Sequence, residues 1–150
     1  MGGDADQIIS AVQDLIDFSK PVAVVLAAVL HFIVDDESAA RSVKDIRRRL
    51  APASFFIVSH ATVPEEHPER IDEVLAVYEK QVTPVKLRTQ KQIRAMFEGM
   101  SLVKTKRMVY APEWCPEVPD PFKKPGKKTS IIDAPARSLL LAGVFEVPGE

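Results

Sequence analysis

The sequence predicts an α/β protein whose sheet contains parallel strands. Two apolar runs, PVAVVLAAVLHFI at Pro21–Ile33 and ASFFIVSHAT at Ala53–Thr62, show no alternation of polar and apolar residues before their histidines. Such continuous runs are typical of strands that are buried on both faces, as in parallel sheets. The segment between them, Asp35–Pro52, has a helical pattern and a suitable length for a crossover connection. Together the three segments predict a β-α-β unit.

Length and composition indicate one domain, spanning residues 1–150, with an ordinary hydrophobic core. The chain is 46% hydrophobic and 27% charged, with a formal net charge of −1. This balance gives no reason to expect binding to nucleic acid or to an anionic membrane. The single cysteine excludes a disulfide within the chain, the longest apolar run is too short to span a bilayer, and the acidic N-terminus does not resemble a signal peptide. We therefore expect a cytoplasmic protein without a membrane segment.

The N-terminal part begins with a helix over Asp4–Asp17, in which Asp4 can act as the N-cap and Gln7 has capping-box spacing. Pro21 follows this helix, and the first strand then covers Pro21–Ile33, with the alternative that its last residues turn into the following loop. The crossover helix lies within Asp35–Pro52. Its N-cap candidates are Asp35, Asp36 and Ser38, and its apolar face contains Ala39, Val43, Ile46 and Leu50.

The second strand, Ala53–Thr62, is followed by a more varied region. The predicted order is a loop at Val63–Pro68, a helix at Glu69–Val82, a linker at Thr83–Leu87, a helix at Gln90–Glu98, a strand at Ser101–Tyr110, an irregular Pro- and Lys-rich loop at 113–137, and a strand at Ser138–Val147. Thr89 is placed to cap the helix at Gln90–Glu98, and Gly99 to end it. A loop joins the last two strands, so we expect them to be antiparallel neighbours.

Several segments resemble one protein family in the same order along the chain. They are DLIDFSKPVAVVLAAVLHFI (Asp14–Ile33), FIVSHAT (Phe56–Thr62), PVKLRTQKQI (Pro84–Ile93), FEGMSLVKTKRMVYAPEW (Phe97–Trp114) and LLLAGVFEV (Leu139–Val147). The set resembles the actinobacterial S-adenosylmethionine-dependent methyltransferases that were formerly grouped as a domain of unknown function. The resemblance covers most of the chain.

The resemblance implies a partial class I methyltransferase sheet of the Rossmann-like kind. The full fold has seven strands in the order 3-2-1-4-5-7-6, and this chain matches strands four to seven, with an antiparallel C-terminal hairpin in a three-layer αβα arrangement. The Gly-rich turn and the acidic residue that binds the cofactor ribose belong to the family's first three strands. Here the six glycines form no G-x-G motif. We therefore expect an incomplete domain that corresponds to the C-terminal half.

An incomplete sheet has a physical consequence. In the full fold the strand at Pro21–Ile33 lies in mid-sheet, whereas without the first three strands it becomes an edge. A long, uncharged and apolar edge favours association with another strand. We therefore expect marginal stability, a homodimer, or pairing with a separate N-terminal half.

Two histidines are the candidate catalytic residues. His31 and His60 come at or near the ends of the two apolar runs, and ligands in open α/β sheets bind at the carboxyl ends of the strands. A neutral histidine there could accept a proton from a methyl acceptor. The alternative is that each histidine only satisfies a loop carbonyl. The resemblance further implies that Leu30, His31 and Phe32 contact the cofactor. Asp35 and Asp36 give only weak support for a metal site, and we expect no bound metal.

The leading interpretation is a methyltransferase that uses S-adenosylmethionine and an unknown small-molecule acceptor, present as a C-terminal half or a truncated form. Because the family's Gly-rich turn is missing, we expect this chain alone to bind the cofactor weakly or not at all. One alternative is a non-catalytic half-domain that acts as an interaction or oligomerisation module. A weaker one is a small α/β domain with unrelated ligand chemistry at His31 and His60.

Overall fold

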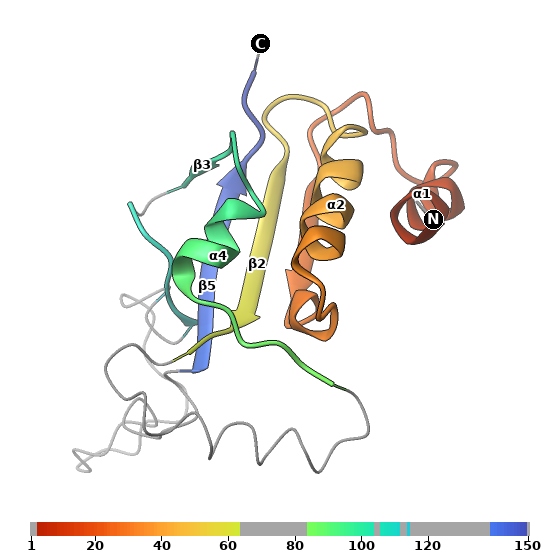
Figure 1. Cartoon of the computed structure of the whole chain (residues 1–150). Helices are drawn as coiled ribbons and strands as arrows, with labels where there is room; N and C mark the ends of the chain where they lie inside the picture. Colours follow the sequence, from red (N-terminus) through yellow and green to blue (C-terminus); the bar gives the residue numbers. More distant parts are fainter. Residues whose placement is uncertain (1–2, 64–83, 104–105, 112–113, 115–138, 150) are drawn as a thin grey trace, which may run out of the picture.

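The computed structural model describes residues 3–63, 84–103, 106–111, 114 and 139–149, and it contains a mixed sheet (Figure 1). The strands are β1 (Ala23–Ala27), β2 (Phe55–Ala61), β3 (Ser101–Leu102), β4 (Val109–Tyr110) and β5 (Leu140–Glu146). They lie in the order β1-β2-β5-β3, and β4 also pairs with β5. The helix and most of the long loop predicted at Glu69–Val82 and 113–137 lie outside the described residues.

The sheet topology confirms the two main strand predictions. β1 and β2 are parallel, and their register pairs Ala23 with Phe55. β5 runs antiparallel to β2, β3 and β4. The observed order β1-β2-β5-β3 corresponds to the order 4-5-7-6 that the family resemblance implied. The β-α-β unit and the antiparallel C-terminal strands are therefore both present.

The described helices are α1 (Gly3–Val12), α2 (Asp36–Arg47), α4 (Gln90–Ala95) and the short 3-10 turn η1 (Leu30–Phe32). Asp35 is the N-cap of α2, and its carboxylate accepts a 2.7 Å hydrogen bond from the amide of Ser38. Thr89 caps α4 and forms a capping box with Gln92. The N-caps predicted at Asp35 and Thr89 are thus confirmed, whereas the N-cap predicted at Asp4 is wrong because α1 already begins at Gly3. All three α-helices are shorter than predicted.

Two predicted strands differ from the structure. The first was expected to continue to Ile33, but β1 ends at Ala27 because Ala28 has a φ of +54°, which turns the chain out of the extended conformation. The strand predicted over Ser101–Tyr110 is wrong as a single element. It consists of β3 and β4, and each is a two-residue strand that pairs with a different part of β5.

Gly99 does not cap α4 directly, because the helix ends at Ala95 with Met96 as its C-cap. Gly99 instead adopts a φ of +76° at the end of the following turn. The guanidinium of Arg47 donates to the carbonyl oxygens of Glu98, at 2.8 Å, and of Gly99, at 3.4 Å. Arg47 therefore connects the C-terminal end of α2 to this turn.

Replacement of Gly99 by alanine tests this turn. We expect Gly99→Ala to lower the free energy of unfolding by about 1–2 kcal/mol, because an L-residue is strained at positive φ. The new Cβ would also lie 3.1 Å from Nη1 of Arg47. Urea denaturation measures the change, with Gly149→Ala as the control because a Cβ there meets nothing within 4 Å. Equal stability of the two variants would contradict the assignment of strain to Gly99.

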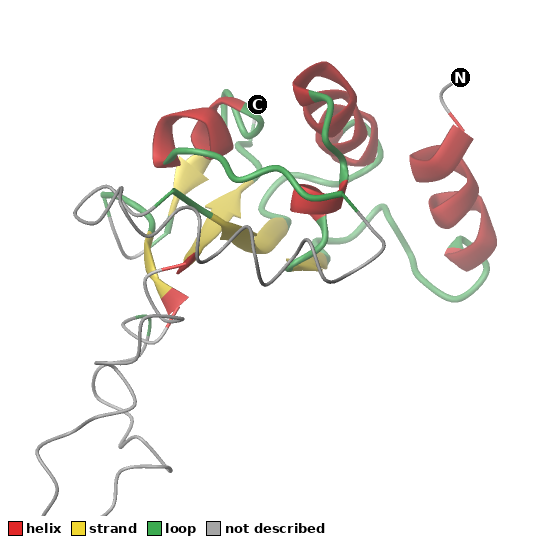
Figure 2. Ribbon diagram, turned by 60° about the horizontal axis from the view of Figure 1, so that its bottom comes forward, coloured by secondary structure: helices red, strands yellow, loops and turns green. Residues whose placement is uncertain are grey.

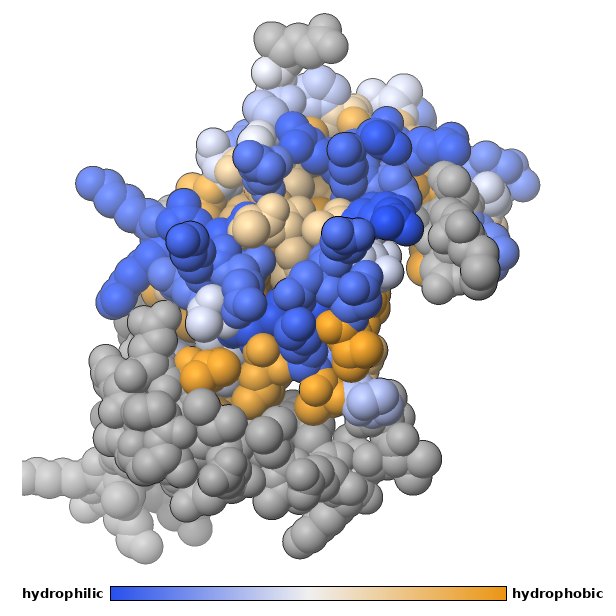
Figure 3. All heavy atoms as spheres, viewed as in Figure 1, coloured by the Kyte–Doolittle hydropathy of each residue, from blue (hydrophilic) through white to orange (hydrophobic). Residues whose placement is uncertain are grey.

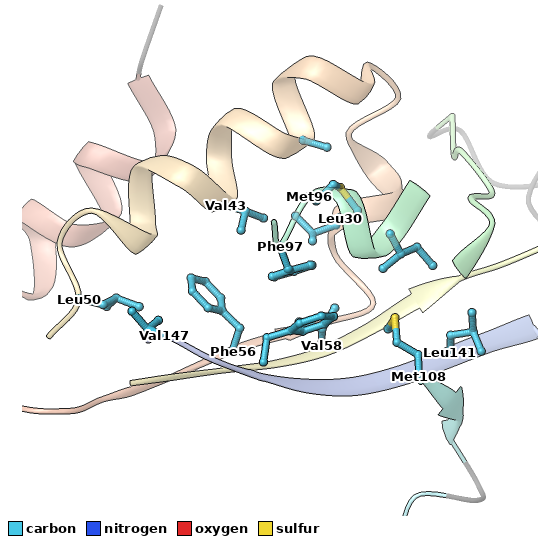
Figure 4. Close-up of a cluster of buried hydrophobic side chains, with 13 residues drawn as sticks. Leu30, Val43, Leu50, Phe56, Val58, Met96, Phe97, Met108, Leu141 and Val147 are labelled. Carbon is cyan, nitrogen blue, oxygen red and sulfur yellow. The ribbon is translucent and has the colours of Figure 1, made fainter. Parts of the chain in front are cut away.

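The hydrophobic core lies between one face of the sheet and the helices α2 and α4 (Figure 4). Phe97 follows α4 and stacks on Phe145 of β5, with ring centroids 4.3 Å apart. It also makes an edge contact with Phe56 of β2, at 5.7 Å. Other buried members of this core are Leu30, Ala39, Val43, Leu50, Val58, Ile93, Met96, Met108, Leu141 and Val147.

The opposite face of the sheet is open in the described part of the chain. Figure 2 shows α2 and α4 on the same side of the strands. Val25 of β1 and the paired Ile57 of β2 are on the other side and are 61% and 42% exposed. The described residues therefore form two layers, and the third layer of the expected αβα arrangement is not among them. Within the same residues, β1 pairs only with β2 and is an edge strand.

Candidate functional site

The candidate site lies where the parallel strands β1 and β2 end, at the lower end of the sheet in Figure 1. Immediately after β1, the chain makes the 3-10 turn Leu30–Phe32. His60 is the penultimate residue of β2. His31 is therefore on a turn and not at a strand end, because β1 is shorter than the apolar run that predicted it.

The fold brings the two histidines together. Their ring centroids are 5.7 Å apart in an edge-to-face arrangement. His31 is 2% exposed and His60 is 0% exposed. The proximity expected from the sequence is thus present, but both imidazoles are covered by protein. A catalytic role for either histidine stays a prediction.

Both ring nitrogens of His60 have protein partners. Nδ1 lies 2.6 Å from the carbonyl oxygen of Ala61, and Nε2 lies 3.2 Å from Nη1 of Arg88. A carbonyl only accepts and a guanidinium only donates, so these partners assign the neutral tautomer with the proton on Nδ1. Burial, with the nearby Arg88 charge as a smaller cause, lowers the pKa of His60 to about 4. His60 is therefore neutral at pH 7, and its acceptor nitrogen is already engaged.

His31 and Phe32 have different environments on the same turn. Burial, with a contribution from the charge of Arg88, lowers the pKa of His31 below its usual value. The rings of His31 and Phe32 lie 4.5 Å apart. Phe32 is 41% exposed, whereas Leu30 is 3% exposed and belongs to the core. Of the three residues expected to contact the cofactor, Phe32 therefore offers the most accessible side chain.

Arg88 is the site residue that the sequence interpretation missed. It is 1% exposed, although a lone arginine ahead of a helix is usually solvated. Its guanidinium contacts Asp36, which also pairs with Lys86. These two cations hold the pKa of Asp36 below its ordinary value. The segment that contains Arg88 was noted only for its family resemblance, and nothing in its local pattern signals burial.

The acidic residues at this end of the sheet have structural partners. Asp35 caps α2, and Asp36 pairs with Arg88 and Lys86. Among the residues that the structure describes, no group of three or more His, Cys, Asp or Glu could hold a metal ion. In the same part of the chain, no helix is long and apolar enough to cross a membrane.

Exposed apolar side chains surround the turn. Val29, Phe32 and Val34 are 46%, 41% and 45% exposed. Figure 3 shows hydrophobic surface at this end of the described part, below a broad hydrophilic region.

A separate cavity of about 590 Å³ lies elsewhere, with Lys91, Arg94, Phe97 and Phe145 in its lining. None of the residues of the candidate site lines it.

The strand order and the parallel pair β1 and β2 match about half of a class I methyltransferase sheet. A family model described as S-adenosyl methyltransferase matches residues 3–139. The chain therefore belongs to the S-adenosyl methyltransferase family, as its sequence resemblance indicated. A comparison with curated proteins gives no match.

Solved structures support the same fold. A DUF574-family protein from Streptomyces avermitilis is 24% identical, with a TM-score of 0.75, and a putative methyltransferase from Thermobifida fusca is 24% identical, with a TM-score of 0.76. Each match covers 99% of this chain but only 53% and 52% of the other. An O-methyltransferase family 2 protein from Planctomyces limnophilus, solved with apigenin, is 15% identical, with a TM-score of 0.51 over 87% of this chain and 32% of its own. The chain thus spans about half the length of the Streptomyces and Thermobifida proteins.

Proposed function

We propose that this chain forms the acceptor-facing half of an S-adenosylmethionine-dependent methyltransferase domain whose small-molecule acceptor is unknown. The observation that supports this most is the turn Leu30–Phe32, which follows the carboxyl end of β1 and carries the exposed ring of Phe32. That end is where open α/β sheets bind their ligands. The family match includes this turn.

The described residues fit the part of the cofactor that carries the reacting methyl group. Val29, Phe32 and Val34 can form an apolar wall that excludes water from a reacting methyl group. S-adenosylmethionine, when bound, supplies that methyl group as an electrophile, and transfer requires alignment with the acceptor and removal of its proton. His31, which is neutral because burial lowers its pKa, is the candidate proton acceptor beside Phe32. Contacts to the ribose would come from residues beyond those described here.

Calorimetric titration with S-adenosylmethionine tests the proposal. We expect binding in the millimolar range and its loss in Phe32→Ala, because this substitution removes the exposed ring of the wall. Ile57→Ala is a matched control, since Ile57 is 42% exposed on the open sheet face and Phe32 is 41% exposed. Equal affinity of the two variants would contradict a role for Phe32. A folded chain that gives no heat at millimolar cofactor would favour a non-catalytic role.

The second candidate function is an interaction module that pairs through β1. It is favoured by the edge position of β1 and by the exposed apolar side chains of Val25 and Ile57. An edge strand with unpaired backbone groups can accept another strand in register. We propose that the occupant is the N-terminal half of a methyltransferase domain, with a second copy of this chain as the other possible outcome.

Sedimentation analysis measures this association. We expect the chain to form a complex with a separately produced N-terminal half, and Val25→Lys to prevent it because lysine places a charge on the apolar face beside the edge. Leu15→Lys is the control, since Leu15 is 85% exposed in the segment after α1. Homodimers in the absence of the other half would instead identify a second copy as the occupant. Identical association of both variants with either occupant would contradict the proposal.

A further inference from the structure

Arg88 joins four segments at the candidate site. Its Nη1 donates to the carbonyl oxygen of Leu30 at 3.3 Å, and Nη2 donates to that of Ile33 at 2.7 Å. Nη1 also lies 3.2 Å from Nε2 of His60, and Nε lies 2.8 Å from Oδ1 of Asp36. A single guanidinium thus connects its own segment to both ends of η1, to β2 and to the first turn of α2.

The backbone around Arg88 reinforces these contacts. The amide of Arg88 donates to the carbonyl of Ala61 at 3.2 Å, at the end of β2. Two residues earlier, the amide of Lys86 donates to the carbonyl of His31 at 2.8 Å. The segment Lys86–Arg88 therefore binds the carbonyls of Leu30 and His31 in the turn and of Ile33, its C-cap. This segment lies across the carboxyl ends of the two parallel strands.

The turn needs such support because its own structure is weak. A 3-10 turn of three residues has little intrinsic stability, and η1 has no side-chain N-cap. The residue that leads into it, Ala28, has a φ of +54°, which is strained for a non-glycine residue. The amide of Ala28 is held by Ser59 through the carbonyl, at 3.1 Å, and the hydroxyl, at 3.0 Å. External hydrogen bonds therefore hold both ends of the turn.

Burial of the Arg88 guanidinium carries a large desolvation cost. Among the described residues its carboxylate partner is Asp36, which is 51% exposed, so the ion pair compensates the buried charge incompletely. A planar guanidinium does, however, fix several acceptors in one geometry, which an apolar side chain or a lysine does not. The arrangement of hydrogen-bond acceptors around the guanidinium therefore explains why an arginine is present here better than a gain in folding stability does.

We infer that Arg88 is a positioning residue, which holds the Leu30–Phe32 turn in the conformation that presents Phe32 at the carboxyl end of β1. This inference rests on the proposed function for its relation to methyl transfer. Arg88 is not itself part of the apolar wall of Val29, Phe32 and Val34. Its side chain is buried, and it donates to the turn from the interior of the protein.

Hydrogen exchange in Arg88→Lys tests the inference on the full chain. Lysine keeps the charge but cannot reach both turn carbonyls and His60 at once. We expect the amides of Phe32 and Ile33, which bond to Val29 and Leu30 within the turn, to exchange about tenfold faster or more. Amides paired between β2 and β5 should change much less. Arg94→Lys is the matched control, since Arg94 is exposed on α4.

The outcomes separate a positioning role from a purely structural one. Equal acceleration in the turn and in the β2–β5 pairs, or no acceleration in either, would overturn the inference. If Arg88→Lys does not fold, Asp36→Asn takes its place, because this variant keeps Arg88 but weakens the contact of its Nε. Faster exchange limited to the turn is again the expected result. An unchanged exchange rate in the turn would overturn the inference. Cofactor titration of the unchanged chain is a separate measurement, so failure to bind would overturn the proposed function without deciding the role of Arg88.

Discussion

Phe97→Ala should lower the free energy of unfolding by about 3–5 kcal/mol, which is the usual cost of removing a buried phenylalanine. Phe97 is 1% exposed and lies between Phe145 and Phe56, with ring centroids at 4.3 Å and 5.7 Å. Its loss opens a cavity in the middle of the only helical layer that the structure describes. Because total stabilities of about 5–15 kcal/mol are typical, this variant is expected to be partly or largely unfolded.

Urea denaturation followed by circular dichroism measures this effect. Ile57→Ala is a suitable comparison, since it also removes apolar volume from a residue of the sheet but from the 42% exposed face. We expect it to cost about 1 kcal/mol or less, because Ile57 is already 42% exposed and its truncation leaves no enclosed cavity. If the two variants were equally destabilised, the open face would have to be buried in solution, and the two-layer arrangement would be wrong.

Acid should weaken the fold through His60 over a defined pH range. Its pKa is about 4 in the folded chain, against 6.5 when the ring is solvated, so the unfolded state binds the proton first. The stabilisation is therefore complete above pH 6.5, is lost as the pH falls from 6.5 to 4, and amounts to roughly 3 kcal/mol. The charged and titratable groups that affect His60 are Arg88, His31 and Asp36.

Stability measured against pH in His60→Gln checks this account. We expect a flatter dependence between pH 4 and 6.5 than in the unchanged chain. Asp17, Asp35 and Asp36 have pKa values lowered from 3.8, so loss of their stabilisation begins mainly below this range. His31→Gln should flatten the curve as well, because burial also lowers the pKa of His31. An unchanged slope in His60→Gln would show that His60 is solvated or remains protonated in the folded protein.

The parts of the fold that the sequence predicted well depend on local patterns. Two apolar runs around an amphipathic helix are sufficient to predict the parallel pair β1 and β2, and Thr89 and Asp35 occupy positions where short polar side chains cap helices. The antiparallel neighbours of β5 were expected because the Pro- and Lys-rich sequence before the last strand predicts a loop and not a crossover helix. These features require little knowledge of distant contacts.

The parts that the sequence did not predict depend on tertiary contacts. The run Pro21–Ile33 is apolar throughout, so composition does not mark Ala28, where positive φ ends β1 and moves His31 onto a turn. Burial of Arg88 results from partners that are 28 to 58 positions away in the sequence. The close approach of His31 and His60 followed from topology alone, whereas the engagement of both His60 nitrogens required the position of Arg88.

The most direct test of the proposed site is a titration of the isotope-labelled chain with S-adenosylhomocysteine, followed by two-dimensional NMR. S-adenosylhomocysteine is the stable product that the cofactor leaves after methyl transfer, and chemical shifts detect weak binding that calorimetry can miss. We predict shifts concentrated at Leu30–Val34, at the carboxyl end of β1. Shifts confined to the cavity lined by Lys91 and Arg94, or spread evenly over the open face around Val25 and Ile57, would contradict a methyl-transfer site at the ends of the parallel strands.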